Sequence, residues 1–143
     1  MPPSLLNILH LEESDFTSEG RLTTMARNLL GLAHKALPLV IMIKGAHCFH
    51  CTRATPEFER IAEHHGHAVV AGVIETQDST HTAQNTTKKP IGRDLLMKLT
   101  GNAFRGVPTY VVLPSAERPW VVYDGDRTAS SIVDFCSKAV TVP

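Results

Sequence analysis

The fold of this chain is indicated by the stretch Lys44-Gly45-Ala46-His47-Cys48-Phe49-His50-Cys51. Before it stands Leu39-Val40-Ile41-Met42-Ile43, a continuous apolar run that predicts a fully buried strand. After it, residues 52–65 carry apolar side chains at helical spacing, namely Ala54, Phe58, Ile61 and Ala62. The two cysteines therefore stand where a buried strand ends and a helix begins.

A cysteine pair at such a junction has the properties of a redox or metal-binding pair. We expect Cys48 near the helix N-terminus, where free backbone N–H groups and the helix dipole favour a thiolate. Cys51 stands one turn further along the helix and is expected to be more shielded from solvent. The position alone leaves redox and metal chemistry both open.

Length and composition favour one globular domain over residues 1–143, long enough to bury a core. Fourteen basic and fourteen acidic residues cancel, so charge predicts neither a nucleic-acid nor a membrane-surface partner. No apolar run approaches the roughly 18 residues of a membrane span, and residues 1–10 lack the basic start of a signal peptide. If Met1 is the native start, we expect a cytoplasmic protein.

The apolar patterns predict the element order β-α-β-α-β-α-β-β-α. The expected strands cover residues 5–11, 39–43, 68–74, 107–113 and 119–123, and the expected helices cover residues 22–36, 52–65, 91–99 and about 128–139. Pro56 lies inside the second helix, where its missing N–H is expected to cause a kink. Residues 76–89 predict a long polar loop, and Cys136 belongs to the apolar face of the last helix.

Over roughly residues 5–140 the chain resembles the thioredoxin superfamily. Cys48-Phe49-His50-Cys51 follows a buried strand, and Pro56 stands where that family has its helix-kinking proline. Gly106-Val107-Pro108-Thr109 matches the family's cis-proline segment, and residues 123–128 are similar to the closing strand of protein disulfide isomerase domains. The resemblance implies a thioredoxin-like α/β fold, with a central mixed β-sheet flanked by helices.

The resemblance also implies a thiol-disulfide oxidoreductase, reductase or isomerase-like, that acts on protein disulfides and dithiols. Cys48 would be the attacking thiolate, and Cys51 the thiol that resolves the mixed disulfide. His50 stands between the cysteines as in disulfide isomerases, where it would stabilise the thiolate and make the disulfide more oxidising. A reductase or glutathione would be the electron partner, and no cofactor or metal is implied.

Four residues near the cysteines are candidates for substrate binding. A cis bond between Val107 and Pro108 costs only about 0.5–1 kcal/mol, and it would expose Val107 backbone groups that can pair with an extended substrate. Phe49 offers an apolar substrate contact or packs locally. His47 replaces the tryptophan that is usual in the family, and it either adds positive charge or is simply exposed.

A further departure from the family concerns the proton of the second cysteine. Six residues before the first cysteine many members carry a buried carboxylate, and here that residue is Met42. The lysine that partners it in thioredoxins would fall near Gly72, so both members of the pair are absent together, as expected because a lone buried charge is costly. Resolution is then slower or uses another base, for which Glu75, His47 and a water are candidates.

Two other interpretations remain open. The altered residues His47, Met42 and Gly72 are compatible with a thioredoxin-fold interaction module whose cysteines are regulatory or vestigial. A zinc site formed by Cys48, Cys51 and a nearby histidine is the third interpretation. A single Cys-x-x-Cys supplies two ligands only, and a histidine within or beside it is poorly placed to complete the set.

Overall fold

The computed structural model of the protein describes residues 8–31, 37–45, 48–76, 91–115 and 117–141. Within these ranges the strands are β1 (Ile8–Leu11), β2 (Leu39–Lys44), β3 (Val70–Glu75), β4 (Thr109–Leu113) and β5 (Val121–Tyr123). The helices are α1 (Thr24–Leu30), α3 (Phe49–His64), α4 (Arg93–Thr100) and α5 (Ala129–Thr141), with a short 3-10 helix, η2 (Glu13–Asp15), after β1.

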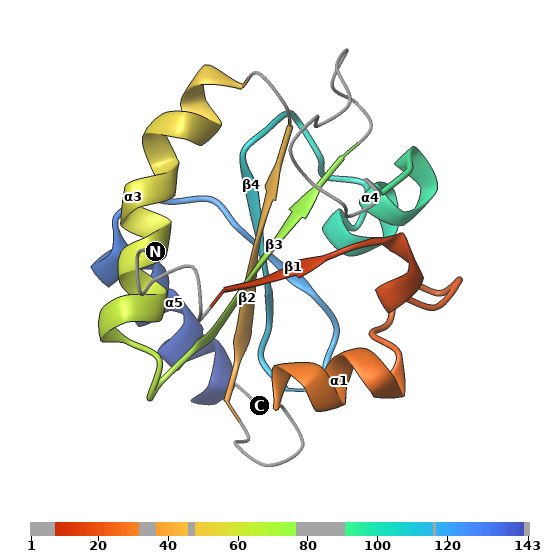
Figure 1. Cartoon of the computed structure of the whole chain (residues 1–143), viewed down its shortest axis with the longest axis horizontal. Coiled ribbons are helices and arrows are strands. Elements are labelled where there is room, and N and C mark those ends of the chain that lie inside the picture. Colours follow the sequence, from red (N-terminus) through yellow and green to blue (C-terminus); the bar gives the residue numbers. More distant parts are fainter. Residues whose placement is uncertain (1–7, 32–36, 46–47, 77–90, 116, 142–143) are drawn as a thin grey trace.

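The strands form one mixed sheet in the order β1-β3-β2-β4-β5. β1, β3 and β2 run parallel, whereas β4 is antiparallel to both β2 and β5. Helices α3 and α5 cover one face of the sheet, and α1 and α4 cover the other (Figure 1). The expected central mixed sheet flanked by helices is confirmed.

Strand β2 lies at the centre of the core and explains the apolar run seen in the sequence. Its residues 39–43 are between 0% and 1% exposed. Val40 and Met42 face the layer of α3 and α5, whereas Leu39, Ile41 and Ile43 face the layer of α1 and α4. Full burial of such a side chain stabilises the fold by roughly 1.5–3 kcal/mol, so this strand fixes the position of the loop that follows it.

Helix α1 is shorter than the expected helix over residues 22–36. The Thr23 side chain accepts a hydrogen bond from the Ala26 N–H at 3.1 Å and starts the helix. Gly31 ends it with a left-handed backbone at φ 73°. Residues 32–36, which the sequence places in the same helix, lie outside the described residues.

Met25 and Leu29 are among the apolar residues at helical spacing in residues 22–36, and that spacing predicts both on the buried face of the helix. The structure corrects this prediction, because Met25 is 73% exposed and Leu29 is 65% exposed. Ala26 and Leu30, four residues apart, supply the buried stripe instead. A helix of two turns presents only one such stripe to the sheet.

Other element boundaries differ for local reasons. α3 begins at Phe49 rather than at residue 52, and Pro56 lies inside it as expected. β4 begins after Pro108 and β5 after Pro119, because proline has no N–H to donate to the ladder. The polar residues 77–89 of the expected loop lie outside the described part of the chain.

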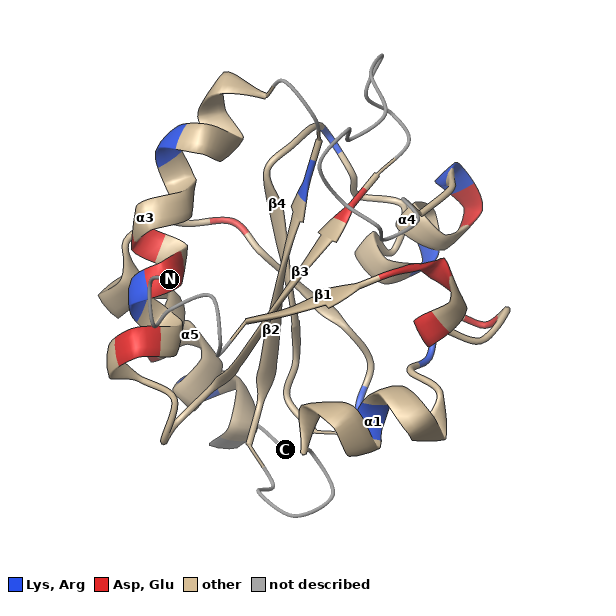
Figure 2. Cartoon of the chain, in the orientation of Figure 1, with Lys and Arg blue, Asp and Glu red and all other residues tan. Residues whose placement is uncertain are grey.

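Charged residues lie on the helices, on the loops and at the ends of β2 and β3, and the centre of the sheet carries none (Figure 2). Both signs occur around the molecule, in keeping with the balanced composition. None of the helices described is long and apolar enough to cross a membrane.

Candidate active site

The first cysteine forms the N-cap of α3. Cys48 has an extended backbone, and its sulfur accepts the N–H of Cys51 at 3.1 Å. The first turn of α3 contains no acidic residue that would offset the positive end of the helix dipole. Cys48 thus lies at the N-terminus of the helix, as the sequence predicts. Free backbone N–H groups and the helix dipole favour a thiolate at such a position.

The two sulfur atoms differ in their access to solvent. Cys48 and Cys51 are joined in a disulfide, with Cα atoms 5.1 Å apart. Cys48 is half-buried, whereas Cys51 is 3% exposed and belongs to the core on the α3 side of the sheet. An external sulfur therefore reaches the pair through Cys48.

The start of β4 lies directly beside the first cysteine. The Val107 carbonyl oxygen is 3.7 Å from the Cys48 sulfur, although the two residues are 59 positions apart in sequence. The Val107–Pro108 peptide bond is cis, Val107 is half-buried and Pro108 is buried. The structure thus brings together four of the predicted site residues, Cys48, Cys51, Val107 and Pro108.

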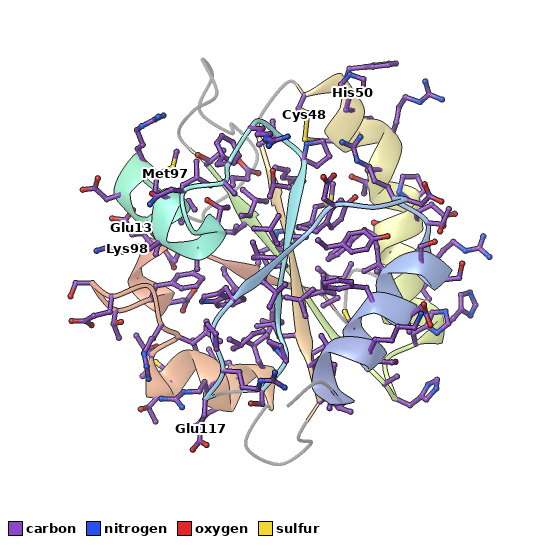
Figure 3. All side chains as sticks on the ribbon, turned by 180° about the vertical axis from the view of Figure 1, so that it is seen from behind. Glu13, Cys48, His50, Met97, Lys98 and Glu117 are labelled. Carbon is purple, nitrogen blue, oxygen red and sulfur yellow. A yellow bond between two sulfur atoms is a disulfide. The ribbon has the colours of Figure 1, made fainter. Side chains whose placement is uncertain are left out.

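Cys48 and His50 lie at the same end of the molecule (Figure 3). Phe49 and His50 are both exposed residues of the first turn of α3. Phe49 is 66% exposed, and its ring meets that of His50 edge-on at a centroid distance of 5.8 Å. The Arg53 guanidinium lies 5.6 Å from the Phe49 ring centroid, a favourable cation–π distance. Phe49 is therefore open to an external partner, and the remaining candidate, His47, lies outside the described residues.

Two arginines of this region were not singled out in the sequence. Arg53 and Arg127 line one pocket together with His50. The i, i+4 spacing of Phe49 and Arg53 on a helix is a signal that could have identified the first. Arg127 is near the site only because the loop between β5 and α5 returns to α3, where Glu57 accepts the Ala129 N–H at 2.8 Å.

The surroundings of Cys51 are apolar, as Met42 predicts. The expectation that Gly72 stands where the lysine partner of residue 42 would lie is wrong. Across the β2–β3 pair the partner of Met42 is Val73, and both side chains belong to the layer of α3. Gly72 faces the opposite layer, where an added Cβ would lie 3.4 Å from a Leu11 methyl carbon. The residue beside Met42 is thus Val73, and it is also apolar.

Tyr110 carries the one unsatisfied hydroxyl among the described buried side chains, and it was not among the candidate residues expected from the sequence. Tyr110 is 2% exposed and stands directly opposite Met42 across the β2–β4 pair. Burial raises the pKa of Tyr110 to about 12, against a smaller opposing effect of the Arg127 charge. A tyrosine in an otherwise apolar strand is the available sequence signal, because its hydroxyl must find a partner or remain unpaired.

The described residues contain no group of three histidine, cysteine or acidic side chains that could hold a metal ion. Cys136, the third cysteine, is a buried free thiol whose pKa is raised to about 12 by burial. It belongs to the core, as the sequence predicts.

No protein-family model and no curated protein matches the chain by sequence. Solved structures do match it. The J-Trx1 fragment of ERdj5 has a TM-score of 0.61 at 16% identity, over 96% of this chain and 53% of that one. The first thioredoxin domain of mouse protein disulfide-isomerase A4 has a TM-score of 0.55 at 22% identity, over 93% and 83% of the two chains.

Chloroplastic thioredoxin z also matches, with a TM-score of 0.55 at 16% identity over 95% of this chain and 96% of that one. The chain spans only 14% of the crystallised ERdj5 form I, so its likeness there is to a part of that protein. The element order, the mixed sheet and the Cys-x-x-Cys pair at the start of α3 agree with these neighbours. The chain is a protein of the thioredoxin-like fold.

Proposed function

We propose that the protein is a thiol-disulfide oxidoreductase that exchanges disulfides with protein substrates through Cys48 and Cys51. The observation that supports this most is the position of the Cys48 sulfur. It caps α3 and accepts the Cys51 N–H at 3.1 Å, while its partner sulfur is buried. One sulfur is thus activated and accessible, and the other is held ready behind it.

Reduction of a substrate follows from this arrangement in two steps. The Cys48 thiolate attacks one sulfur of the substrate disulfide, forming a mixed disulfide and releasing the other sulfur as a thiolate that takes up a proton. Cys51 then loses its proton and attacks the Cys48 sulfur, which releases the second substrate thiol. Two electrons pass from the cysteine pair to the substrate, and oxidation of a dithiol is the reverse.

The residues around Cys48 would hold an extended polypeptide. Val107 offers backbone groups within reach of the reacting sulfur, so that a substrate segment can pair with it beside Pro108. Phe49 is exposed and supplies apolar contact, and His47 is a further candidate for this surface. His50 is assigned the role of stabilising the Cys48 thiolate, which favours the dithiol and gives the disulfide an oxidising, isomerase-like character.

The electron partner is proposed to be a reductase or glutathione, in the cytoplasm. The direction of exchange and the choice of partner both depend on the reduction potential of the pair. Equilibration of Cys48 and Cys51 with glutathione buffers would measure that potential and separate a reductase from an isomerase-like protein.

Insulin reduction by dithiothreitol tests the proposal, with precipitation of the freed B chain as the readout. The wild type should accelerate it, and Cys48→Ser should abolish the acceleration. Cys136→Ala is the matched control, because it removes a buried free cysteine that is not part of the disulfide and should leave the rate unchanged. Equal rates for wild type and Cys48→Ser would refute the catalytic role.

A second candidate function is a protein-interaction module with regulatory or vestigial cysteines. The apolar surroundings of Cys51, formed by Met42 and Val73, favour it because they leave the resolving thiol without a carboxylate to take its proton. A glutathione titration in which Cys48 and Cys51 show no reversible couple would support this candidate over the first.

A further inference from the structure

The Tyr110 hydroxyl is buried in the layer of the cysteine pair, and the role inferred for it rests on the proposed function. Tyr110 is 2% exposed, and its oxygen has no hydrogen-bond partner among the described residues. An unsatisfied buried hydroxyl is unfavourable by about 1–3 kcal/mol, so an isolated one calls for a physical explanation. The neighbouring Tyr123 has no such need, because its hydroxyl donates to the Asp126 carbonyl at 2.6 Å.

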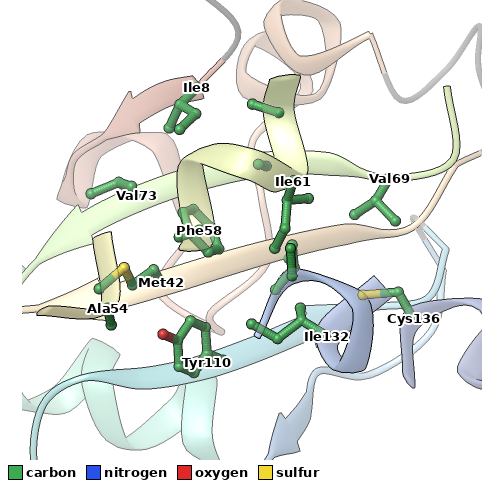
Figure 4. Packing of buried hydrophobic residues seen from close by; sticks show 14 of the residues in the cluster. Ile8, Met42, Ala54, Phe58, Ile61, Val69, Val73, Tyr110, Ile132 and Cys136 are labelled. Carbon is green, nitrogen blue, oxygen red and sulfur yellow. The ribbon is translucent and has the colours of Figure 1, made fainter. Parts of the chain in front are cut away.

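The hydroxyl lies in the layer that holds the second cysteine. Tyr110 is the cross-strand partner of Met42, and both belong to the same buried cluster as Cys51 and Ala54. Figure 4 shows the Tyr110 oxygen on the side of its ring that faces Ala54, which stands one helical turn after Cys51. The hydroxyl therefore points toward the N-terminal half of α3, where the disulfide lies.

Opening of the disulfide changes what this hydroxyl can bind. While Cys51 is bonded to Cys48, its sulfur is a weak acceptor and the hydroxyl has no anion to bind. During exchange the Cys51 sulfur carries negative charge, either as it attacks the mixed disulfide or as it leaves the pair. An apolar environment disfavours that charge, and a hydrogen bond to an ionised group is stronger than a neutral one.

We propose that the Tyr110 hydroxyl donates a hydrogen bond to the Cys51 sulfur when that sulfur is a thiolate. In the resolving step the Cys51 thiol gives its proton to water, its sulfur forms the bond to Cys48, and the substrate sulfur leaves with the bonding electrons and is protonated. Tyr110 keeps its own proton throughout, since burial holds the pKa of this hydroxyl at about 12. It stabilises the charge and does not act as a base.

The proposal is tested with Tyr110→Phe, which removes only the hydroxyl. Tyr123→Phe is the matched control, because it removes a hydroxyl from the adjoining ring, 6.2 Å away between centroids. Reduced protein in excess is mixed with dithiobis(nitrobenzoate), and the coloured thiolate is followed by stopped flow. The first release reports attack by Cys48, and the second reports resolution by Cys51.

We expect Tyr110→Phe to leave the first release unchanged and to slow the second about tenfold, with its pH profile shifted upward by about one unit. Tyr123→Phe should change neither. An unaltered second release, or an equal slowing of both releases without a shift in pH, would overturn the proposal. If wild type itself lacks the second release, it is the proposed exchange function that fails.

The elements on this side of the sheet carry other charged or titratable groups. These are Cys48 at the N-cap of α3, His50 and Glu57 of α3, Lys44 and Glu75 at the ends of β2 and β3, Tyr123 of β5, Arg127 in the loop before α5 and Cys136 of α5. All of them except the Tyr123 hydroxyl are common to wild type and both variants. A second measurement needs no variant. In wild type the NMR signal of the Tyr110 ring carbon bearing oxygen should follow the titration of Cys51, and its failure to do so would refute the hydrogen bond.

Discussion

Introducing a carboxylate at residue 42 tests whether water is excluded from the buried space beside Cys51. Met42 is 1% exposed and is flanked by Val73 and Tyr110 on the neighbouring strands. Burial of this kind raises the pKa of a carboxyl by up to 3–5 units. We therefore expect the carboxyl introduced by Met42→Asp to stay protonated in the folded state at neutral pH.

The size of the effect follows from linkage. Below about pH 4 the carboxyl is neutral in both the folded and the unfolded state. As the pH rises above that value the unfolded state ionises and the folded state does not, so stability falls by about 1.36 kcal/mol per pH unit. Between pH 4 and pH 7 the loss should reach about 4 kcal/mol, a large part of the usual stability of a domain.

Urea unfolding of the oxidised protein between pH 4 and pH 7 measures this slope, because the disulfide keeps Cys48 and Cys51 from titrating. Met42→Asn is the control, because asparagine has nearly the same shape as aspartate but cannot ionise. The loss of stability that it causes should therefore not depend on pH. A slope for Met42→Asp no steeper than that of Met42→Asn would show that water reaches the site, and would refute the reasoning.

The same experiment tests the strand register. Adding Val73→Lys to Met42→Asp should reduce the slope, because the two residues are partners on the same face of β2 and β3. Adding Gly72→Lys should not, since that side chain would point into the opposite layer against Leu11 and Ile41. Rescue by Gly72→Lys rather than by Val73→Lys would show the register to be wrong.

Two further predictions concern Cys136 and Phe49. Burial raises the pKa of Cys136 from 9.0 to about 12. Its contribution to stability is therefore complete below about pH 9 and is lost as the pH rises toward 12. In urea unfolding of the oxidised protein, Cys136→Ala should flatten the fall in stability above pH 9, and an unchanged curve would contradict the burial. Phe49 is 66% exposed, so Phe49→Ala should leave the melting temperature unchanged. The variant should lower kcat/KM for a protein disulfide about three- to tenfold, which corresponds to a loss of roughly 0.7–1.4 kcal/mol of apolar contact. For a small disulfide kcat/KM should change little, and an equal loss with both substrates would argue against a role in protein recognition.

The sequence predicts well those elements in which every residue of the apolar pattern is buried in the structure. The apolar run of β2 is buried on both faces, so no other placement was available to it. The helix after the cysteines shows its buried stripe from Cys51 to Ala62. Helix α1 was predicted less well. Its apolar residues are more numerous than its buried face requires, and a pattern cannot tell which of Met25, Ala26, Leu29 and Leu30 meet the sheet.

The residues of the candidate site also fall into those that the sequence can identify and those that depend on the three-dimensional arrangement. Cys48 and Cys51 could be named from their spacing, and Val107 and Pro108 from the resemblance of their segment to the cis-proline segment of the thioredoxin superfamily. Tyr110 could not, since its importance depends on which residue lies opposite it and on where its hydroxyl points. The misplacement of Gly72 has the same cause, because a shift of one residue moves a side chain to the other face of a sheet.

The pairing of an apolar Met42 with a neutral Tyr110 has a consequence for the pH dependence of exchange. A carboxylate at residue 42 would titrate together with the Cys51 thiol, and the two would share macroscopic pKa values. A hydroxyl whose pKa is about 12 does not titrate in the range in which thiols ionise. The resolving step should then follow a single ionisation, that of the Cys51 thiol. A proton relay through a buried acid is thereby replaced by a fixed donor, which stabilises the thiolate without competing for its proton.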